Sequence, residues 1–107
     1  MNRLLDKVAV VTGAGGGIGL GGARRFAAEG AKVVIAELNE STGKCAANEI
    51  ESEFGTRVLF VKTDVSQKED ILAMVDATVH HFERVDILVN NAWGGGQLSR
   101  LQYKPTA

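Results

Sequence analysis

The sequence predicts an α/β fold that contains an incomplete, doubly wound parallel sheet. Short apolar runs rich in β-branched residues alternate along the chain with segments of helical periodicity. A glycine-rich segment, residues 13–22, joins the first apolar run to the first helical segment. We therefore expect the order β-α-β-α-β-α-β over residues 1–93, followed by a loop or disordered tail over residues 94–107.

Four apolar runs are the predicted strands, and they cover residues 7–11, 32–36, 57–61 and 86–89. None of these runs alternates polar with apolar residues. A continuous apolar run is typical of a strand that is buried on both faces, as in parallel sheets covered by helices. Each crossover between such strands is expected to be right-handed.

Three segments between the runs are the predicted helices, and they cover residues 18–29, 40–54 and 66–82. Gly30 and Gly55 are the expected stops of the first two. The third is expected to begin with a capping box, in which Ser66 and Glu69 each satisfy a free backbone N–H of the other. Its expected apolar face consists of Ile71, Val75, Val79 and Phe82.

The expected strand order is 3-2-1-4. In this arrangement the first two helices cover one face of the sheet and the third lies on the other. The fourth strand is then an open edge beside a face that carries a single helix. Because open edges and bare apolar faces promote association, we expect the isolated chain to be marginally stable, self-associating or prone to aggregation.

Composition and charge exclude several classes of function. The 107 residues include 12 basic and 13 acidic side chains, which argues against nucleic acid or an anionic membrane as a partner. No apolar run is long enough to span a membrane, and no signal-peptide pattern is present at the start. The single Cys45 excludes an internal disulfide, so the cytoplasm is the expected compartment. The adjacent pair His80 and His81 would diverge on a helix, so no metal site is expected.

The glycine-rich segment is the main functional signal. It opens the first predicted helix, where unpaired backbone N–H groups and the positive end of the helix dipole can bind an anion. Gly13, Gly17 and Gly19 fit a G-x-x-x-G-x-G spacing, and glycine lets the backbone approach a dinucleotide pyrophosphate closely. The phosphate loop of nucleoside triphosphatases is rejected, because the only Gly-Lys pair, residues 43–44, lies in a predicted helix. A merely flexible loop is the alternative interpretation.

Glu37 is the second functional signal, at the expected end of the second strand. A carboxylate at this point can accept hydrogen bonds from both hydroxyls of an adenosine ribose, and it would repel a 2′-phosphate. Neither Gly16 nor Leu38 provides a basic side chain that could offset the repulsion. The sequence therefore favours NAD over NADP, with a solvated strand-end carboxylate as the alternative interpretation.

Three motifs follow one another along the chain: residues 12–19 read T-G-A-G-G-G-I-G, residues 64–65 read D-V, and residues 86–92 read D-I-L-V-N-N-A. Together with Glu37, these motifs resemble the short-chain dehydrogenase/reductase family, whose nucleotide-binding region is a Rossmann fold. The resemblance covers roughly residues 5–95. It implies that the loop from Gly13 to Gly19 holds the pyrophosphate.

The resemblance also implies the role of each residue. Glu37 holds the ribose, Asp64 and Val65 frame the adenine, and Asn91 lies near the ribose on the nicotinamide side. Asn90 ties the fourth strand to its neighbours. The candidate cofactor-binding residues are Thr12, Gly13, Gly16, Gly17, Ile18, Gly19, Glu37, Leu38, Asp64, Val65 and Asn91.

The family's catalytic Ser-Tyr-Lys group is not expected in this chain. That group needs Tyr and Lys four residues apart, but four residues after the only tyrosine, Tyr103, stands Ala107. Lys104 is adjacent to the tyrosine, and Ser99 lacks a partner, so no catalytic residue is assigned. The expected function is the NAD-binding portion of an oxidoreductase that transfers hydride to or from an alcohol or carbonyl substrate, inactive alone. A non-catalytic nucleotide-binding or interaction module is the alternative.

Overall fold

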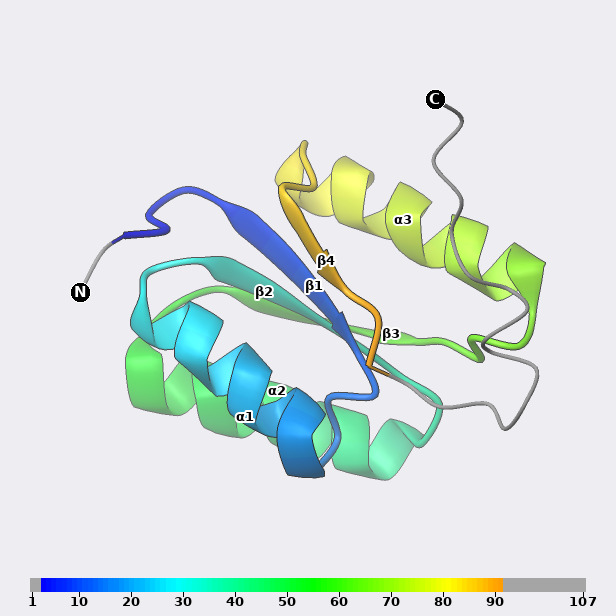
Figure 1. The fold of residues 1–107 in the computed structure, drawn as a ribbon, viewed down its shortest axis with the longest axis horizontal. Coiled ribbons are helices and arrows are strands. Elements are labelled where there is room, and N and C mark those ends of the chain that lie inside the picture. The colour runs from blue at the N-terminus through cyan, green and yellow to red at the C-terminus, as the bar shows by residue number, and fades with distance from the viewer. Residues whose placement is uncertain (1–2, 92–107) are drawn as a thin grey trace.

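The computed structural model describes residues 3–91, which form a four-stranded parallel sheet with helices on both faces (Figure 1). The elements in chain order are β1 (Val8–Thr12), α1 (Gly17–Ala28), β2 (Lys32–Glu37), α2 (Glu40–Phe54), β3 (Val58–Lys62), α3 (Lys68–Phe82) and β4 (Ile87–Val89). The strand order β3-β2-β1-β4 confirms the predicted topology. The tail expected over residues 94–107 lies outside the described residues.

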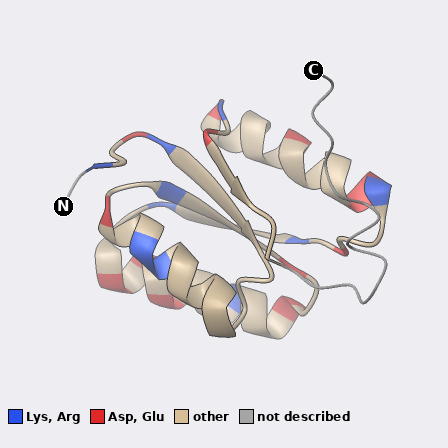
Figure 2. Cartoon of the chain, in the orientation of Figure 1, with Lys and Arg blue, Asp and Glu red and all other residues tan. Residues whose placement is uncertain are grey.

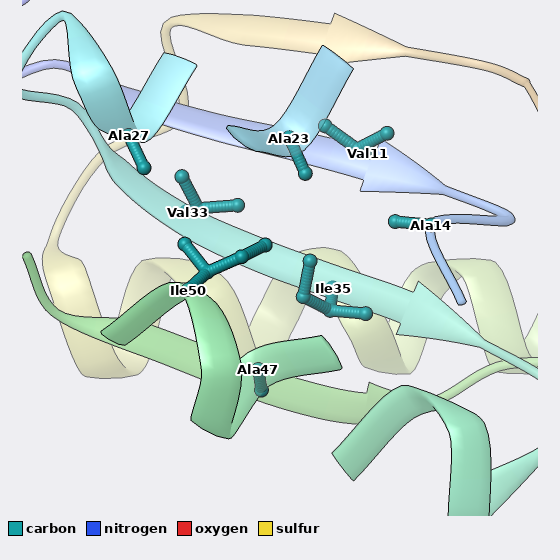
Figure 3. Close-up of a cluster of buried hydrophobic side chains, with 8 residues drawn as sticks. All are labelled: Val11, Ala14, Ala23, Ala27, Val33, Ile35, Ala47 and Ile50. Carbon is teal, nitrogen blue, oxygen red and sulfur yellow. The ribbon is translucent and has the colours of Figure 1, made fainter. Parts of the chain in front are cut away.

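β1 and β2 form the buried centre of the sheet. On one face, Val11, Val33 and Ile35 pack against α1 and α2 (Figure 3). On the opposite face, Val10 and Val34 pack in a second cluster with residues of α3. Neighbouring residues of one strand therefore contribute to different clusters, which explains why these strands are continuous apolar runs.

The rotation of α3 about its axis differs from the prediction. Met74, Thr78 and Phe82 are its buried residues, whereas Val75 and Val79 are 36% and 44% exposed. Thr78 can face the sheet because its hydroxyl donates a hydrogen bond to the Met74 carbonyl oxygen at 2.8 Å, which offsets the cost of burying a polar group. A periodicity argument that places apolar valine rather than polar threonine on the buried face misses this arrangement.

The start of α3 also differs from the prediction. The capping box is absent: Gln67 occupies the N-cap, and no side chain caps the helix. Ser66 instead donates its backbone N–H and its hydroxyl to Asp64 Oδ1. A carboxylate two residues upstream competes for the serine in a local turn, and a charged acceptor forms the stronger bond.

Two glycines within helices predict opposite effects of the same substitution. An alanine Cβ at the exposed Gly21 of α1 meets open space, whereas at the buried Gly43 of α2 it would strike the Phe60 ring. We expect Gly21→Ala to raise the free energy of unfolding by about 1 kcal/mol, because alanine favours a helix. Gly43→Ala is expected to lower it by about 1–3 kcal/mol through overpacking. Urea unfolding of the two variants checks this, and equal effects would contradict it.

Candidate cofactor-binding site

The glycine loop connects β1 to α1 and depends on glycine at three positions. Gly13 and Gly17 have φ angles of 66° and 60°, which lie in the left-handed region that side chains disfavour. At the buried Gly19, a Cβ would overlap the carbonyl oxygen of Gly13 and lie 2.6 Å from Asn91 Nδ2. Helix α1 therefore begins in close contact with both the turn that precedes it and the end of β4.

The first turn of α1 is arranged to receive an anion. Its N-cap, Gly16, has extended backbone geometry and no side-chain capping bond, and no acidic residue lies in the first turn. Figure 2 shows that the chain between β1 and α1 carries no charged side chain. The leading N–H groups of a helix lack intrahelical partners, and the dipole makes this end positive. An anionic ligand here would meet backbone donors, and the first turn of α1 itself provides no carboxylate that competes for them.

Glu37 links the end of β2 to the glycine loop. Its Oε1 accepts the Gly15 N–H at 3.0 Å, and its Oε2 accepts the Asn39 N–H at 3.0 Å. A Cβ at Gly15 would lie 2.8 Å from both Glu37 Oε1 and Thr42 Oγ1, so a side chain at this position would displace the ends of these two side chains. Each carboxylate oxygen has two lone pairs, and each can still accept a hydrogen bond from a ligand hydroxyl.

Gly15 and Thr42 are residues that the sequence reasoning missed. The second glycine of the Gly13-x-Gly15 pair is the signal that could have identified Gly15. Thr42 gives no such signal, because its contribution depends on Asn39, the N-cap of α2. The Asn39 side chain accepts the Thr42 N–H at 3.0 Å, and this bond fixes the first turn of α2 beside the glycine loop.

Thr12 joins the ends of β1 and β4. Its hydroxyl oxygen accepts the Asn91 N–H at 2.8 Å and lies 3.3 Å from both the Val89 carbonyl oxygen and Asn90 Oδ1. Asn90 thus contacts the neighbouring strand, as expected. The Asn91 side chain lies against Gly19, so the end of β4 packs directly on the start of α1.

The connection between β3 and α3 is held by its own side chains. Asp64 Oδ1 accepts the Ser66 hydroxyl at 2.6 Å and the Ser66 backbone N–H at 3.0 Å. These two hydrogen bonds, the hydroxyl first, lower the pKa of the Asp64 carboxyl. Val65 lines a cavity of about 390 Å³ between α3 and β4, together with Leu72 and Leu88.

The predicted site residues occupy one edge of the sheet. They lie at or just beyond the carboxyl ends of β1, β2, β3 and β4, where parallel sheets of this kind bind their ligands. Backbone bonds join adjacent strand ends: the Gly13 N–H donates to Ala36 O at 2.8 Å, and the Thr63 N–H donates to Glu37 O at 3.0 Å. Glu37 and Asn91 contact the glycine loop directly, whereas Asp64 follows Thr63, whose backbone is bonded to Glu37.

Two apolar side chains at this edge have little cover within residues 3–91. Ile18, in the first turn of α1, is 87% exposed, and Leu38, after β2, is 55% exposed.

Within residues 3–91 no group of three or more His, Cys, Asp or Glu side chains could hold a metal ion. No helix there has both the length and the apolar character needed to cross a membrane.

Comparison with known proteins relates this arrangement to an enzyme family. Residues 7–105 match the family model described as short chain dehydrogenase. The short chain dehydrogenase/reductase astE of Aspergillus oryzae is 54% identical over 89 residues, which are 83% of this chain and 34% of that protein. The L-fucose dehydrogenase of Oryctolagus cuniculus is 41% identical over 100 residues, which are 94% of this chain and 34% of that protein. The chain thus spans about a third of the length of these relatives.

Solved structures have the same fold. L-sorbose reductase from Gluconobacter frateurii, complexed with NADPH and L-sorbose, superposes with a TM-score of 0.84 at 41% identity, over 90% of this chain and 37% of that one. NAD+-bound xylitol dehydrogenase superposes with a TM-score of 0.81 at 36% identity, over 84% of this chain and 34% of that one. The chain belongs to the short-chain dehydrogenase family of oxidoreductases, and its sheet and helices form part of that family's nicotinamide-dinucleotide-binding Rossmann fold.

Proposed function

We propose that the chain binds NAD(H) along the carboxyl edge of its sheet, as the cofactor-binding part of a hydride-transferring oxidoreductase. The observation that carries this proposal is the hydrogen bond between the Glu37 carboxylate and the Gly15 N–H. This hydrogen bond places the negative charge of Glu37 beside the loop that would bind the pyrophosphate. A 2′-hydroxyl can donate a hydrogen bond to this carboxylate, whereas a 2′-phosphate would be repelled by it.

The remaining contacts follow the order of groups in a dinucleotide. The pyrophosphate would accept hydrogen bonds from the N–H groups at the start of α1. The exposed Leu38 and the partly exposed Val65 would cover the adenine, since apolar side chains favour its faces. Ile18 and Asn91 would lie toward the nicotinamide. Burial against the cofactor gives the exposed Ile18 side chain an apolar partner.

A bound nicotinamide dinucleotide supplies the hydride-transfer chemistry, and the protein binds and orients it. Ser99, Tyr103 and Lys104 lie outside the described residues, and Tyr103 is the only tyrosine in the sequence. We therefore assign binding and orientation to this chain and no proton-transfer role. Turnover of a small alcohol or carbonyl compound would belong to a longer protein. The reducing cytoplasm is the proposed compartment, because Cys45 is exposed as a free thiol.

Calorimetric titration of the 107-residue chain with NADH and NADPH tests the proposed function. We expect saturable binding of NADH and weaker binding of NADPH. The absence of heat with either dinucleotide would contradict the proposal as a whole. Equal or tighter binding of NADPH would contradict the role of Glu37 and leave the glycine-loop site intact.

Self-association of the chain is proposed from its exposed apolar surface. Leu72, Val79 and Leu88 are 59%, 44% and 54% exposed around α3 and around β4, which is an edge strand of the sheet formed by residues 3–91. A second copy could cover this surface and pair with that edge. Sedimentation velocity is expected to show dimers or larger species, and Leu88→Lys is expected to shift them to monomer. Leu5→Lys, at another exposed leucine, is the control, and a monomeric unaltered chain would contradict the proposal.

A further inference from the structure

One residue of the β3–α3 connection, Asp64, is fixed through both its backbone and its side chain. Its backbone N–H donates to Asp70 Oδ2 at 2.9 Å. Its side-chain Oδ1 accepts the two bonds from Ser66. Asp70 belongs to the first turn of α3, where its own N–H donates to Gln67 O at 3.1 Å. The loop is therefore tied to the helix at Asp70.

The bond that Asp70 makes differs from a helix cap. A capping carboxylate accepts N–H groups within the first turn of its own helix. Gln67 is the N-cap of α3 and has no side-chain capping bond. The Asp70 carboxylate reaches instead to an N–H six residues upstream, outside the helix. Its contact thus constrains the loop that carries Asp64 and Val65.

This arrangement leaves one oxygen of Asp64 available. Oδ1 accepts both bonds from Ser66, whereas Oδ2 accepts none of the hydrogen bonds found within residues 3–91. An aspartate is ionised at neutral pH, and the bonds from Ser66 lower the pKa of this carboxyl further. A carboxylate oxygen is an acceptor only, and the 6-amino group of adenine is a donor. The anchored carboxylate can therefore recognise that amino group through its second oxygen.

We propose that Asp70 is a positioning residue for the adenine end of the cofactor site, acting through the backbone of Asp64. This inference rests on the proposed function, since it concerns the same dinucleotide. Asp70 itself does not touch the ligand. It holds the Asp64 N–H, and this contact fixes the direction from which the carboxylate meets the 6-amino group. Loss of the contact lets the loop move, and the site loses its selectivity for adenine.

The test compares NADH with reduced nicotinamide hypoxanthine dinucleotide, in which an oxygen replaces the 6-amino group. We expect the unaltered 107-residue chain to bind NADH about tenfold more tightly than the hypoxanthine analogue, because a hydrogen bond to a charged group is lost. In Asp70→Leu, the affinity for NADH is expected to fall about tenfold and the preference to disappear. Asp70→Asn retains an acceptor oxygen for the Asp64 N–H and is expected to restore both.

Glu69→Leu is the matched control. It removes the same charge one position earlier in the same helical turn, from an exposed side chain. The preference for adenine should persist in this variant. Asp70→Ala replaces the leucine variant if circular dichroism shows that leucine prevents folding.

Four other results of these titrations would overturn the inference. A loss of affinity in Asp70→Leu that is equal for the two dinucleotides, with the preference retained, would mean that Asp70 only stabilises the fold. An asparagine variant as defective as the leucine variant would rule out the hydrogen bond as the cause. An unaltered chain that binds both dinucleotides equally would remove the role of Asp64. An unaltered chain that binds neither would overturn the proposed function as well, which distinguishes the two failures.

Discussion

Replacing Glu37 with glutamine is expected to change the ratio of NADPH to NADH affinity about 100-fold in favour of NADPH. The substitution removes the negative charge that would face a 2′-phosphate, which raises NADPH affinity about tenfold. It also replaces a charge-assisted hydrogen bond to the ribose with a neutral one, which lowers NADH affinity about tenfold. The amide oxygen of glutamine can still accept either the Gly15 or the Asn39 N–H, so the loop retains part of its support.

The matched control for this experiment is Glu40→Gln. Glu40 lies in the first turn of α2, three residues from Glu37, and forms a 2.8 Å ion pair with Lys44 on the exposed surface. Its replacement changes the net charge equally but leaves the Gly15 bond intact. Calorimetric titration of both variants with both dinucleotides measures the ratio. A ratio that is unchanged in Glu37→Gln, or changed equally in Glu40→Gln, would contradict a specific role for Glu37.

Gly19→Ala is expected to give the second large effect, a loss of both stability and cofactor affinity. The added Cβ overlaps the Gly13 carbonyl oxygen and crowds Asn91 Nδ2. The first of these atoms is backbone, so α1 must move away from the turn. Alanine ordinarily stabilises a helix by about 1 kcal/mol relative to glycine. We expect a net loss of about 1–3 kcal/mol instead, and NADH affinity at least about tenfold lower, because the N–H groups of the loop no longer converge.

Gly21→Ala serves as the control for that variant. It makes the same change two residues further along α1, at a position with open space around the new methyl group. Urea unfolding should therefore shift in opposite directions for the two variants, and NADH titration should show a loss of affinity only for Gly19→Ala. A Gly19→Ala protein that unfolds and binds NADH like the unaltered chain would show that close contact between helix and turn is not required.

Local patterns were sufficient to predict the architecture and the main features of the site. The continuous apolar runs located all four strands to within about one residue. The spacing of Gly13, Gly17 and Gly19 identified positions where the structure has either a positive φ angle or no room for a side chain. These features depend on backbone geometry that short stretches of sequence encode directly.

The features that were missed or wrong depend on contacts between distant residues or on competition between neighbours. The hydrogen bond between Gly15 and Glu37 joins residues that are 22 positions apart, and the spacing of the glycines does not predict this partner. The buried face of α3 includes Thr78, because the Thr78 hydroxyl donates a hydrogen bond to the Met74 carbonyl oxygen and can therefore be buried. The capping box at Ser66 fit a local rule, but Asp64 provided a stronger partner for the same groups.

β1 lies between β2 and β4, and its pairing with β2 is expected to be more stable than its pairing with β4. β1 pairs with β2 over five residues, beginning with Val8 and Lys32, but with β4 over only three, beginning with Ala9 and Ile87. The chain segment between β1 and β4 is longer than the segment between β1 and β2. The loss of chain entropy on pairing is therefore larger for β4 by about 1 kcal/mol. Fraying should therefore begin at β4, with faster amide hydrogen exchange there than in β2. A transient opening of this kind would release the nicotinamide end while the adenosine end stayed assembled.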